Sequence, residues 1–137
     1  MSQENVEVAR QALAATSGGD PHGSRPFSDP LIEWDMSGVP EWVALERPVY
    51  RGEEVWEFLR SWADAWHDWH FDVIDLRDGA DDRVFSGIHE QAIGVESDVS
   101  VDQHRYLIFT VRSGRITRVQ MFSDRVEALE AAGLRDS

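Results

Sequence analysis

The chain has no cysteine, which excludes disulfide bonds, thiol catalysis and zinc sites built on cysteine. It is also poor in basic residues, with 13 lysines and arginines against 26 aspartates and glutamates, a net charge of −13 and a pI near 4.6. A surface this acidic repels phosphate backbones and anionic lipids. We therefore expect neither a nucleic acid nor a membrane as a partner.

Long apolar runs are missing as well. No segment approaches the ~18 consecutive apolar residues that a membrane-spanning helix needs. The first residues, MSQENVEVARQALAAT, do not combine a basic stretch with an apolar one as a signal peptide does. The glycine pair Gly18-Gly19 follows a predicted helix instead of opening one, so it does not form a phosphate-binding loop. From these absences we expect a cytoplasmic protein without a cofactor.

What is present fits one domain, residues 1–137, with a hydrophobic fraction of 42% that suffices for a core. The apolar spacing predicts helices near 2–18, 53–68 and 125–132 and strands near 31–35, 71–76, 83–95, 99–112 and 116–123. Ser113-Gly114 predicts a hairpin turn, Asp124 an N-cap, and Gly133 a helix end. Residues 36–50, which include Trp42, predict a loop or lid. Short turns make the late strands antiparallel, and helices ahead of such a sheet give an α+β fold.

The segment WADAWHDWHFDV, residues 62–73, raises the question of a metal site, because it holds His67, Asp68, His70 and Asp72. Metal ligands must converge on one point. The first two are predicted at a helix end. The other two are predicted on the outer side of a strand, opposite Phe71 and Val73 in the core. No metal site is therefore expected.

The tryptophans of the long helix allow two interpretations. Trp62 and Trp66 continue the apolar stripe of that helix, so they are either ordinary core or part of a ligand-cavity wall. Trp56 lies off the stripe, and we predict that it packs on a dimer partner or on the loop at 36–50.

The strand at 99–112 is apolar on both faces, with Leu107 on one face and Tyr106 and Ile108 on the other. The long helix can cover the first face. The second face, to which Phe122 adds, needs a covering layer, and we expect no remaining element of the chain to supply it. We therefore predict a homodimer that packs sheet on sheet through Tyr106, Ile108 and Phe122.

The chain resembles the SnoaL-like family of the nuclear transport factor 2-like superfamily in four segments: MSQENVEVARQAL with GGD after it, DPLIEWD, VYRGEEVWEFLRSWADAW followed by FDVIDLRDGADDRV, and RYLIFTVRSGRITRVQMFSDRVEALEAAGL. The resemblance implies a cone, in which a curved antiparallel sheet wraps around the N-terminal helices and encloses an apolar pocket. Relatives include polyketide cyclases, ketosteroid isomerases, epoxide hydrolases and proteins without known activity. Homodimers packed sheet on sheet are frequent among them.

The catalytic residues of these relatives do not carry over. Cyclases of this kind resemble a pattern with a histidine and an aspartate on the last two strands, and aligned on Ser113-Gly114 those positions hold Leu107 and Met121. The carboxylate base of the steroid isomerases falls on Trp34, with Asp35 adjacent. Because apolar residues cannot shuttle a proton, the resemblance implies an apolar cavity, with a lining that comprises Trp34, Trp62, Trp66, Leu107 and Met121.

Polar residues are predicted on the central strands. Gln103 and Arg105 share the predicted cavity side and can orient polar groups of a ligand. Arg105 either pairs with Glu90 or Glu33 or clamps an anionic group. His89 is a candidate proton carrier or an ordinary polar residue, and the sequence does not decide its face because both sides of that strand are mixed.

Three functions follow from these residues. The first is a homodimeric protein that binds a small hydrophobic molecule in the cavity. The second is a cofactor-free isomerase, cyclase or hydrolase in which Asp35 or His89 is the base and Arg105 or Gln103 stabilises an oxyanion. The third is an interaction domain whose cavity is filled by its own side chains.

Overall fold

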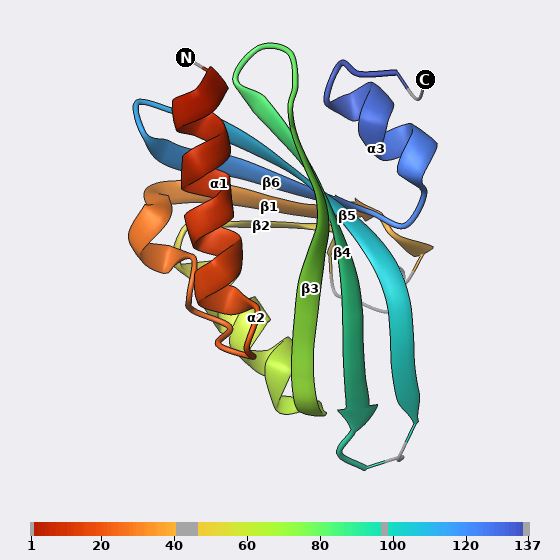
Figure 1. Cartoon of the computed structure of the whole chain (residues 1–137). Helices are drawn as coiled ribbons and strands as arrows, with labels where there is room; N and C mark the ends of the chain where they lie inside the picture. Colours follow the sequence, from red (N-terminus) through yellow and green to blue (C-terminus); the bar gives the residue numbers. More distant parts are fainter. Residues whose placement is uncertain (1, 41–46, 97–98, 136–137) are drawn as a thin grey trace.

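The computed structural model describes residues 2–40, 47–96 and 99–135 of the chain (Figure 1). The helices are α1 (Ser2–Thr16), the 3-10 helix η1 (Arg25–Phe27), α2 (Glu53–Asp64) and α3 (Arg125–Ala131). The strands are β1 (Ser28–Gly38), β2 (Val49–Arg51), β3 (Trp66–Asp78), β4 (Arg83–Gly94), β5 (Ser100–Arg112) and β6 (Arg115–Phe122). None of the described helices is long and apolar enough to cross a membrane.

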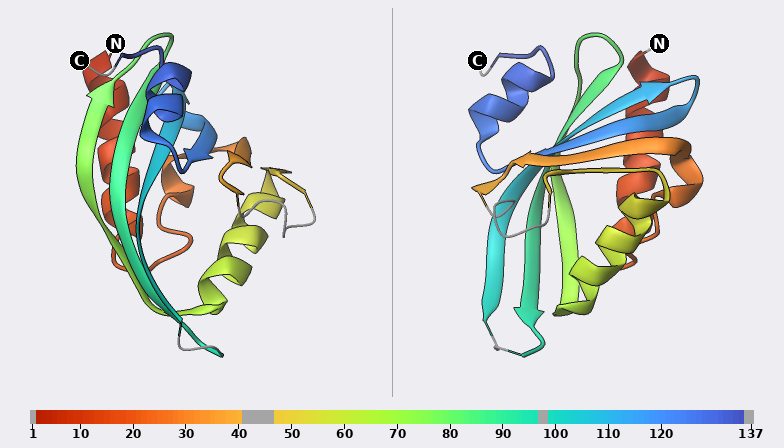
Figure 2. Two further views of the ribbon diagram at one scale, coloured as in Figure 1. Left: turned by 90° about the vertical axis from the view of Figure 1, so that its right-hand side faces the viewer. Right: turned by 180° about the vertical axis from the view of Figure 1, so that it is seen from behind.

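The strands form one curved sheet in the order β2-β1-β6-β5-β4-β3. Figure 2 shows that β3, β4 and β5 bend strongly, so that one end of each strand curves toward α2. The α+β fold with a curved sheet around the first helices is confirmed. One detail adds to the prediction: β1 pairs with β6 in parallel, whereas the other neighbouring strands are antiparallel.

Local sequence explains the turns and caps. Ser113 and Gly114 both have positive φ, 52° and 75°, as a two-residue hairpin turn requires. The Asp124 side chain accepts a hydrogen bond from the backbone N–H of Val126 at 3.2 Å and caps α3. Gly133 follows that helix with φ 74°. These three predictions are confirmed.

The long helix is shorter than predicted. It ends at Asp64, and Trp66 already begins β3. The apolar spacing predicted too long a helix because Trp66, the first residue of β3, lies four residues after Trp62 and so continues the helical spacing by chance. Trp56 is also placed differently: it is 4% exposed and belongs to the main core, where its ring meets the edge of His22.

The predicted loop at 36–50 is only partly described. Its first residues, through Gly38, extend β1, and Val49 opens the short strand β2. Trp42 lies outside the described residues.

The sheet has a core on each face. The concave face packs against α1 and α2, and Ala9, Leu13 and Val55 supply helix side chains to that core. On the opposite face, Phe85 and Ile108 pack against Ala128, Leu129 and Ala132 of the α3 region, with Tyr106 and Phe122 partly buried beside them. The chain therefore has the second layer that the sequence reasoning missed.

This second layer corrects the predicted dimer surface. Ile108 is fully buried beneath α3, so it cannot meet another subunit. A homodimer stays a prediction, and only the partly buried Tyr106 and Phe122 remain available to it.

The α3 layer is also held by charge. Asp75 on β3 accepts hydrogen bonds from Arg77 at 3.1 Å and from Arg125 of α3 at 3.3 Å. Burial alone raises the pKa of Asp75, but the hydrogen bonds and charges of the two arginines outweigh it, and the pKa is lowered. A carboxyl group with a lowered folded-state pKa stabilises the fold above its unfolded pKa, near 3.9, and this contribution is lost as the pH falls through the folded value.

We therefore expect stability to fall on acidification below about pH 4. The Asp75→Asn variant should lose part of the neutral-pH stability and show a weaker acid dependence, measured by denaturant unfolding at several pH values. Parallel pH curves for the variant and the wild type would contradict this role.

Candidate functional site

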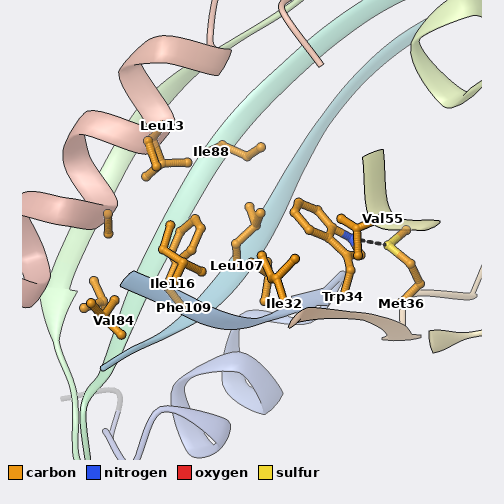
Figure 3. Close-up of a cluster of buried hydrophobic side chains, with 14 of the residues drawn as sticks. Leu13, Ile32, Trp34, Met36, Val55, Val84, Ile88, Leu107, Phe109 and Ile116 are labelled. Carbon is orange, nitrogen blue, oxygen red and sulfur yellow. Dashed lines mark hydrogen bonds between the residues drawn. The ribbon is translucent and has the colours of Figure 1, made fainter. Parts of the chain in front are cut away.

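A cavity of about 240 Å³ lies between the concave face of the sheet and the helices α1 and α2. Figure 3 shows Leu13 of α1, Trp34 of β1, Ile88 of β4 and Leu107 of β5 gathered beside one another in this region. Apolar side chains dominate the lining, and its polar side chains are few: Thr16, Ser24, Glu90, Gln103 and Arg105. A concave apolar space with few polar groups is the usual form of a small-molecule site.

All seven residues predicted to bind a ligand line this cavity: Trp34, Trp62, Trp66, Gln103, Arg105, Leu107 and Met121. Strand alternation explains the agreement, because residues two apart on β5 point to the same side of the sheet. Their position is thus as predicted, whereas ligand binding by them stays a prediction.

Three tryptophans form one wall of the cavity. The ring centroid of Trp62 lies 5.8 Å from that of Trp66 and 5.0 Å from that of Trp69, the second pair meeting edge to face. Such contacts fix the rings relative to one another. Trp69 was not among the predicted site residues.

A bulge turns Trp69 toward the cavity. The register of β3 against β4 shifts between His67 and His70, and Asp68 has φ 52°. The bulge lets Trp66 and Trp69, three residues apart, both line the cavity. Only the tolerance of aspartate for positive φ hints at it in the sequence.

The loop after α1 braces this bulge. Gly19, with φ 109°, approaches the Trp69 carbonyl so closely that a Cβ atom would lie 2.7 Å from that oxygen. The backbone N–H of Phe71 donates to the carbonyl of Ser17 at 3.0 Å. Gly19 therefore serves close packing against β3.

One side chain of β3 departs from the prediction. Phe71 is buried as predicted, whereas Val73, two residues further along this edge strand and paired with Ile88, is 41% exposed. His70 and Asp72 are exposed, in agreement with the sequence.

Glu90 is the carboxylate inside the cavity. It is 4% exposed, and each oxygen accepts one hydrogen bond at 2.8 Å, Oε2 from Trp69 Nε1 and Oε1 from Gln103 Nε2. The sequence reasoning considered Glu90 only as a partner for Arg105. The other acid considered for that role, Glu33, pairs instead with Arg51 and Arg118.

Asp35 lies on the opposite side of β1 from Trp34, outside the residues that line the cavity. Its carboxylate accepts hydrogen bonds from the backbone N–H and the hydroxyl of Ser37, at 2.9 and 2.6 Å, and from Arg118 at 3.2 Å. It holds a turn and an ion pair, and it is not placed to act as a base on a cavity ligand.

His89 is likewise outside the cavity. Its Nε2 pairs with Asp102, and its ring lies 5.1 Å from that of His104 on β5. The hydrogen bond from His89 lowers the pKa of Asp102 below its usual value. The hypothesis that His89 carries protons for the cavity is therefore not supported by its position.

No three histidine, aspartate or glutamate side chains come together in a metal-binding arrangement within residues 2–40, 47–96 and 99–135. The polar groups in the cavity lining are one carboxylate, two hydroxyl groups, and amide, indole and guanidinium donors. These groups suit hydrogen bonding to a ligand.

Comparison with known proteins identifies the fold. No protein-family model and no curated protein match the chain. Solved structures do match it. TerC, co-crystallised with polyporic acid, has 20% identity and a TM-score of 0.72, over 93% of this chain and 98% of that one.

Two bacterial structures are similar in the same way. A nuclear transport factor 2-like protein from Burkholderia thailandensis E264 has 23% identity and a TM-score of 0.72, over 93% of this chain and 95% of that one. A protein from Jannaschia sp. CCS1, assigned as a SnoaL-like polyketide cyclase, has 15% identity and a TM-score of 0.74, over 96% and 92%. The TM-scores establish a shared fold, and at identities this low the similarity shows the fold alone.

Proposed function

Because this chain has the fold of nuclear transport factor 2-like and SnoaL-like proteins, we propose that it binds a small hydrophobic molecule in its cavity. The observation that carries the proposal is an apolar space of about 240 Å³ with one hydrogen-bonded carboxylate, Glu90, in its wall. This volume lies below the ~300–1,000 Å³ of pockets for drug-sized ligands, so we expect a small ligand. That TerC was co-crystallised with polyporic acid supports the use of this fold for small organic ligands.

The few polar groups set the expected orientation of the ligand. Glu90, Gln103 and Arg105 come from neighbouring strands, and Glu90 pairs with Gln103 across them. A ligand hydroxyl would meet this group while its rings lie against Trp62, Trp66 and Trp69. One polar contact in an apolar pocket is a common source of orientation and specificity.

Fluorescence titration tests this proposal. Four tryptophans line the cavity, so a bound naphthol should change the intrinsic emission of the protein with saturation. Ala92→Phe fills the cavity near Glu90, and we expect it to weaken binding at least about tenfold, equivalent to about 1.4 kcal/mol.

Ile93→Phe is the matched control. Ile93 is the next residue of β4, is 40% exposed and does not line the cavity, so naphthol should bind this variant as it binds the wild type. Equal binding by both phenylalanine variants would place the ligand elsewhere. No response of the wild type to naphthol or related molecules would favour an interaction domain.

The enzymatic alternative needs a different base from the two that the sequence indicated. Asp35 and His89 both lie outside the cavity lining. A cofactor-free isomerase, cyclase or hydrolase would require a proton acceptor within it.

A further inference from the structure

A wall of tryptophans and a carboxylate lie side by side in the cavity. Trp62, Trp66 and Trp69 all line it, and each is only half-buried by the protein. Among the described residues of the lining, Glu90 is the one carboxylate. Trp69 joins the two features, because its indole N–H donates to Glu90 Oε2 at 2.8 Å. A ligand group that reaches Glu90 is therefore next to the tryptophans.

Glu90 brings a negative charge into an apolar space. It is 4% exposed, and its two hydrogen bonds come from neutral donors, the indole of Trp69 and the amide of Gln103. These bonds orient the carboxylate without cancelling its charge. A carboxylate has about four lone-pair sites, so it keeps acceptor capacity for a ligand N–H. A ligand ammonium group supplies both a donor and the opposite charge.

The tryptophan rings favour the same ligand charge. The face of an indole ring is negative, and it attracts a cation that lies within about 6 Å of the ring centroid. The Trp62 centroid lies 5.8 Å from that of Trp66 and 5.0 Å from that of Trp69, so the three rings form one continuous surface. N-alkyl groups of a ligand can lie on this surface and also match the apolar remainder of the lining.

Arg105 is the cation of the lining, and the register of the sheet sets it apart from the tryptophans. Trp66 pairs with Gly94, so the tryptophan wall lies toward the end of β4. Glu90 comes next, paired with Gln103, and Arg105 lies beyond it, paired with Ile88. Residues two apart on a strand are about 7 Å from each other. A cation between the tryptophans and Glu90 is therefore on the side of Glu90 that is away from the Arg105 backbone.

We infer that the ligand is a hydrophobic amine, bound as a tertiary or quaternary ammonium ion with its nitrogen between Glu90 and the rings of Trp62, Trp66 and Trp69. The net charge of −13 supports this charge class, because it attracts cations to the protein and repels anions. This inference names the ligand class of the proposed binding function and rests on that function.

Three probes that share a benzyl group test the preference for a cation. N,N-dimethylbenzylamine is protonated at neutral pH, isobutylbenzene is its neutral isostere with C–H in place of N–H, and phenylacetate is an anion. Each is titrated into the protein while the tryptophan emission is followed. We expect the amine to bind at least about tenfold more tightly than isobutylbenzene, and phenylacetate to bind most weakly. Tighter binding of phenylacetate than of the amine would overturn the inference.

Two variants locate the preference. Glu90→Gln keeps the shape of the side chain and removes its charge, so the amine should lose at least about tenfold in affinity, whereas isobutylbenzene should change less than about twofold. Trp66→Leu keeps an apolar wall but removes a ring, so the preference for the amine over isobutylbenzene should fall about threefold. Amine binding that is as tight in Glu90→Gln as in the wild type would refute the inference.

Asp102→Asn is the matched control. It removes one negative charge from an exposed position on β5 that does not line the cavity, so both affinities should equal those of the wild type. A loss of amine affinity in this variant as large as in Glu90→Gln would trace the preference to the overall charge of the protein and would contradict a site at Glu90.

The remaining outcomes separate this inference from the binding proposal. If naphthol and isobutylbenzene bind but the amine binds no more tightly than isobutylbenzene, the ammonium class is refuted and the binding function stands. If neither naphthol nor any of the three probes changes the emission, both proposals fail.

Discussion

Replacing Ile108 by aspartate is expected to unfold the protein. Ile108 is fully buried between the sheet and α3, in contact with a cluster that includes Phe85 and Leu129. An aspartate there loses the apolar burial and places a charge without a partner in an apolar environment, a change that costs about 4 kcal/mol or more. Since domains have only about 5–15 kcal/mol of stability, we expect most of the cooperative denaturant transition to be lost.

Ile93→Asp is the control with the same chemical change. Ile93 is 40% exposed on β4, and its substitution should alter the free energy of unfolding by less than about 1 kcal/mol. If Ile108→Asp instead gave a folded monomer from a wild-type dimer, Ile108 would be a subunit contact and the position of α3 would be wrong.

Replacing Trp34 by alanine is expected to cost about 3–5 kcal/mol, the range for a large buried aromatic residue. Trp34 is 7% exposed, and its indole N–H donates to Met36 Sδ at 3.1 Å, the dashed contact in Figure 3. It lies where β1 meets the cavity, so its loss removes core packing as well as part of the wall. Chemical denaturation of the variant measures this cost.

Trp66→Ala separates packing from ligand contact. Trp66 is half-buried at the start of β3, so its removal should cost about 1 kcal/mol in stability but weaken naphthol binding about tenfold. Trp34→Ala should therefore mainly lower the stability of the protein, whereas Trp66→Ala should mainly lower its affinity for naphthol. Equal losses of stability would mean that Trp66 is ordinary core.

The regular alternation of β5 made part of the site predictable. Gln103, Arg105 and Leu107 are two residues apart, and an uninterrupted strand turns such residues to one face. Met121 of β6 pairs with Leu107 of β5, so the same reasoning predicted its side of the sheet. The hairpin at Ser113-Gly114 fixed the register from which these positions were counted.

The parts that failed depend on departures from regular periodicity. Trp69 lies within the register shift of β3 between His67 and His70, and a bulge changes the side of the sheet that a residue faces. Val73 is exposed although it keeps the register of Phe71, because β3 is the edge strand, a position that alternation alone does not reveal. The side of Glu90 could not be decided because β4 is covered on both faces near its start. Val84 belongs to the concave core and Phe85 to the α3 cluster.

The α3 layer was missed for a different reason. The sequence predicts the helix, its N-cap Asp124 and its end at Gly133, but the apolar stripe is short: Ala128, Leu129 and Ala132. Whether so short a stripe packs on its own sheet or remains open to a partner depends on the curvature of the sheet, which local patterning does not encode. The apolar outer side of β5 was therefore assigned to a second subunit.

A crystal structure of the protein equilibrated with naphthol tests the central claim most directly. The account predicts electron density for the rings among Trp62, Trp66 and Trp69, with the hydroxyl oxygen within hydrogen-bond distance of Glu90. Density on any other surface, or a cavity that closes on its own side chains in the presence of saturating naphthol, would contradict it.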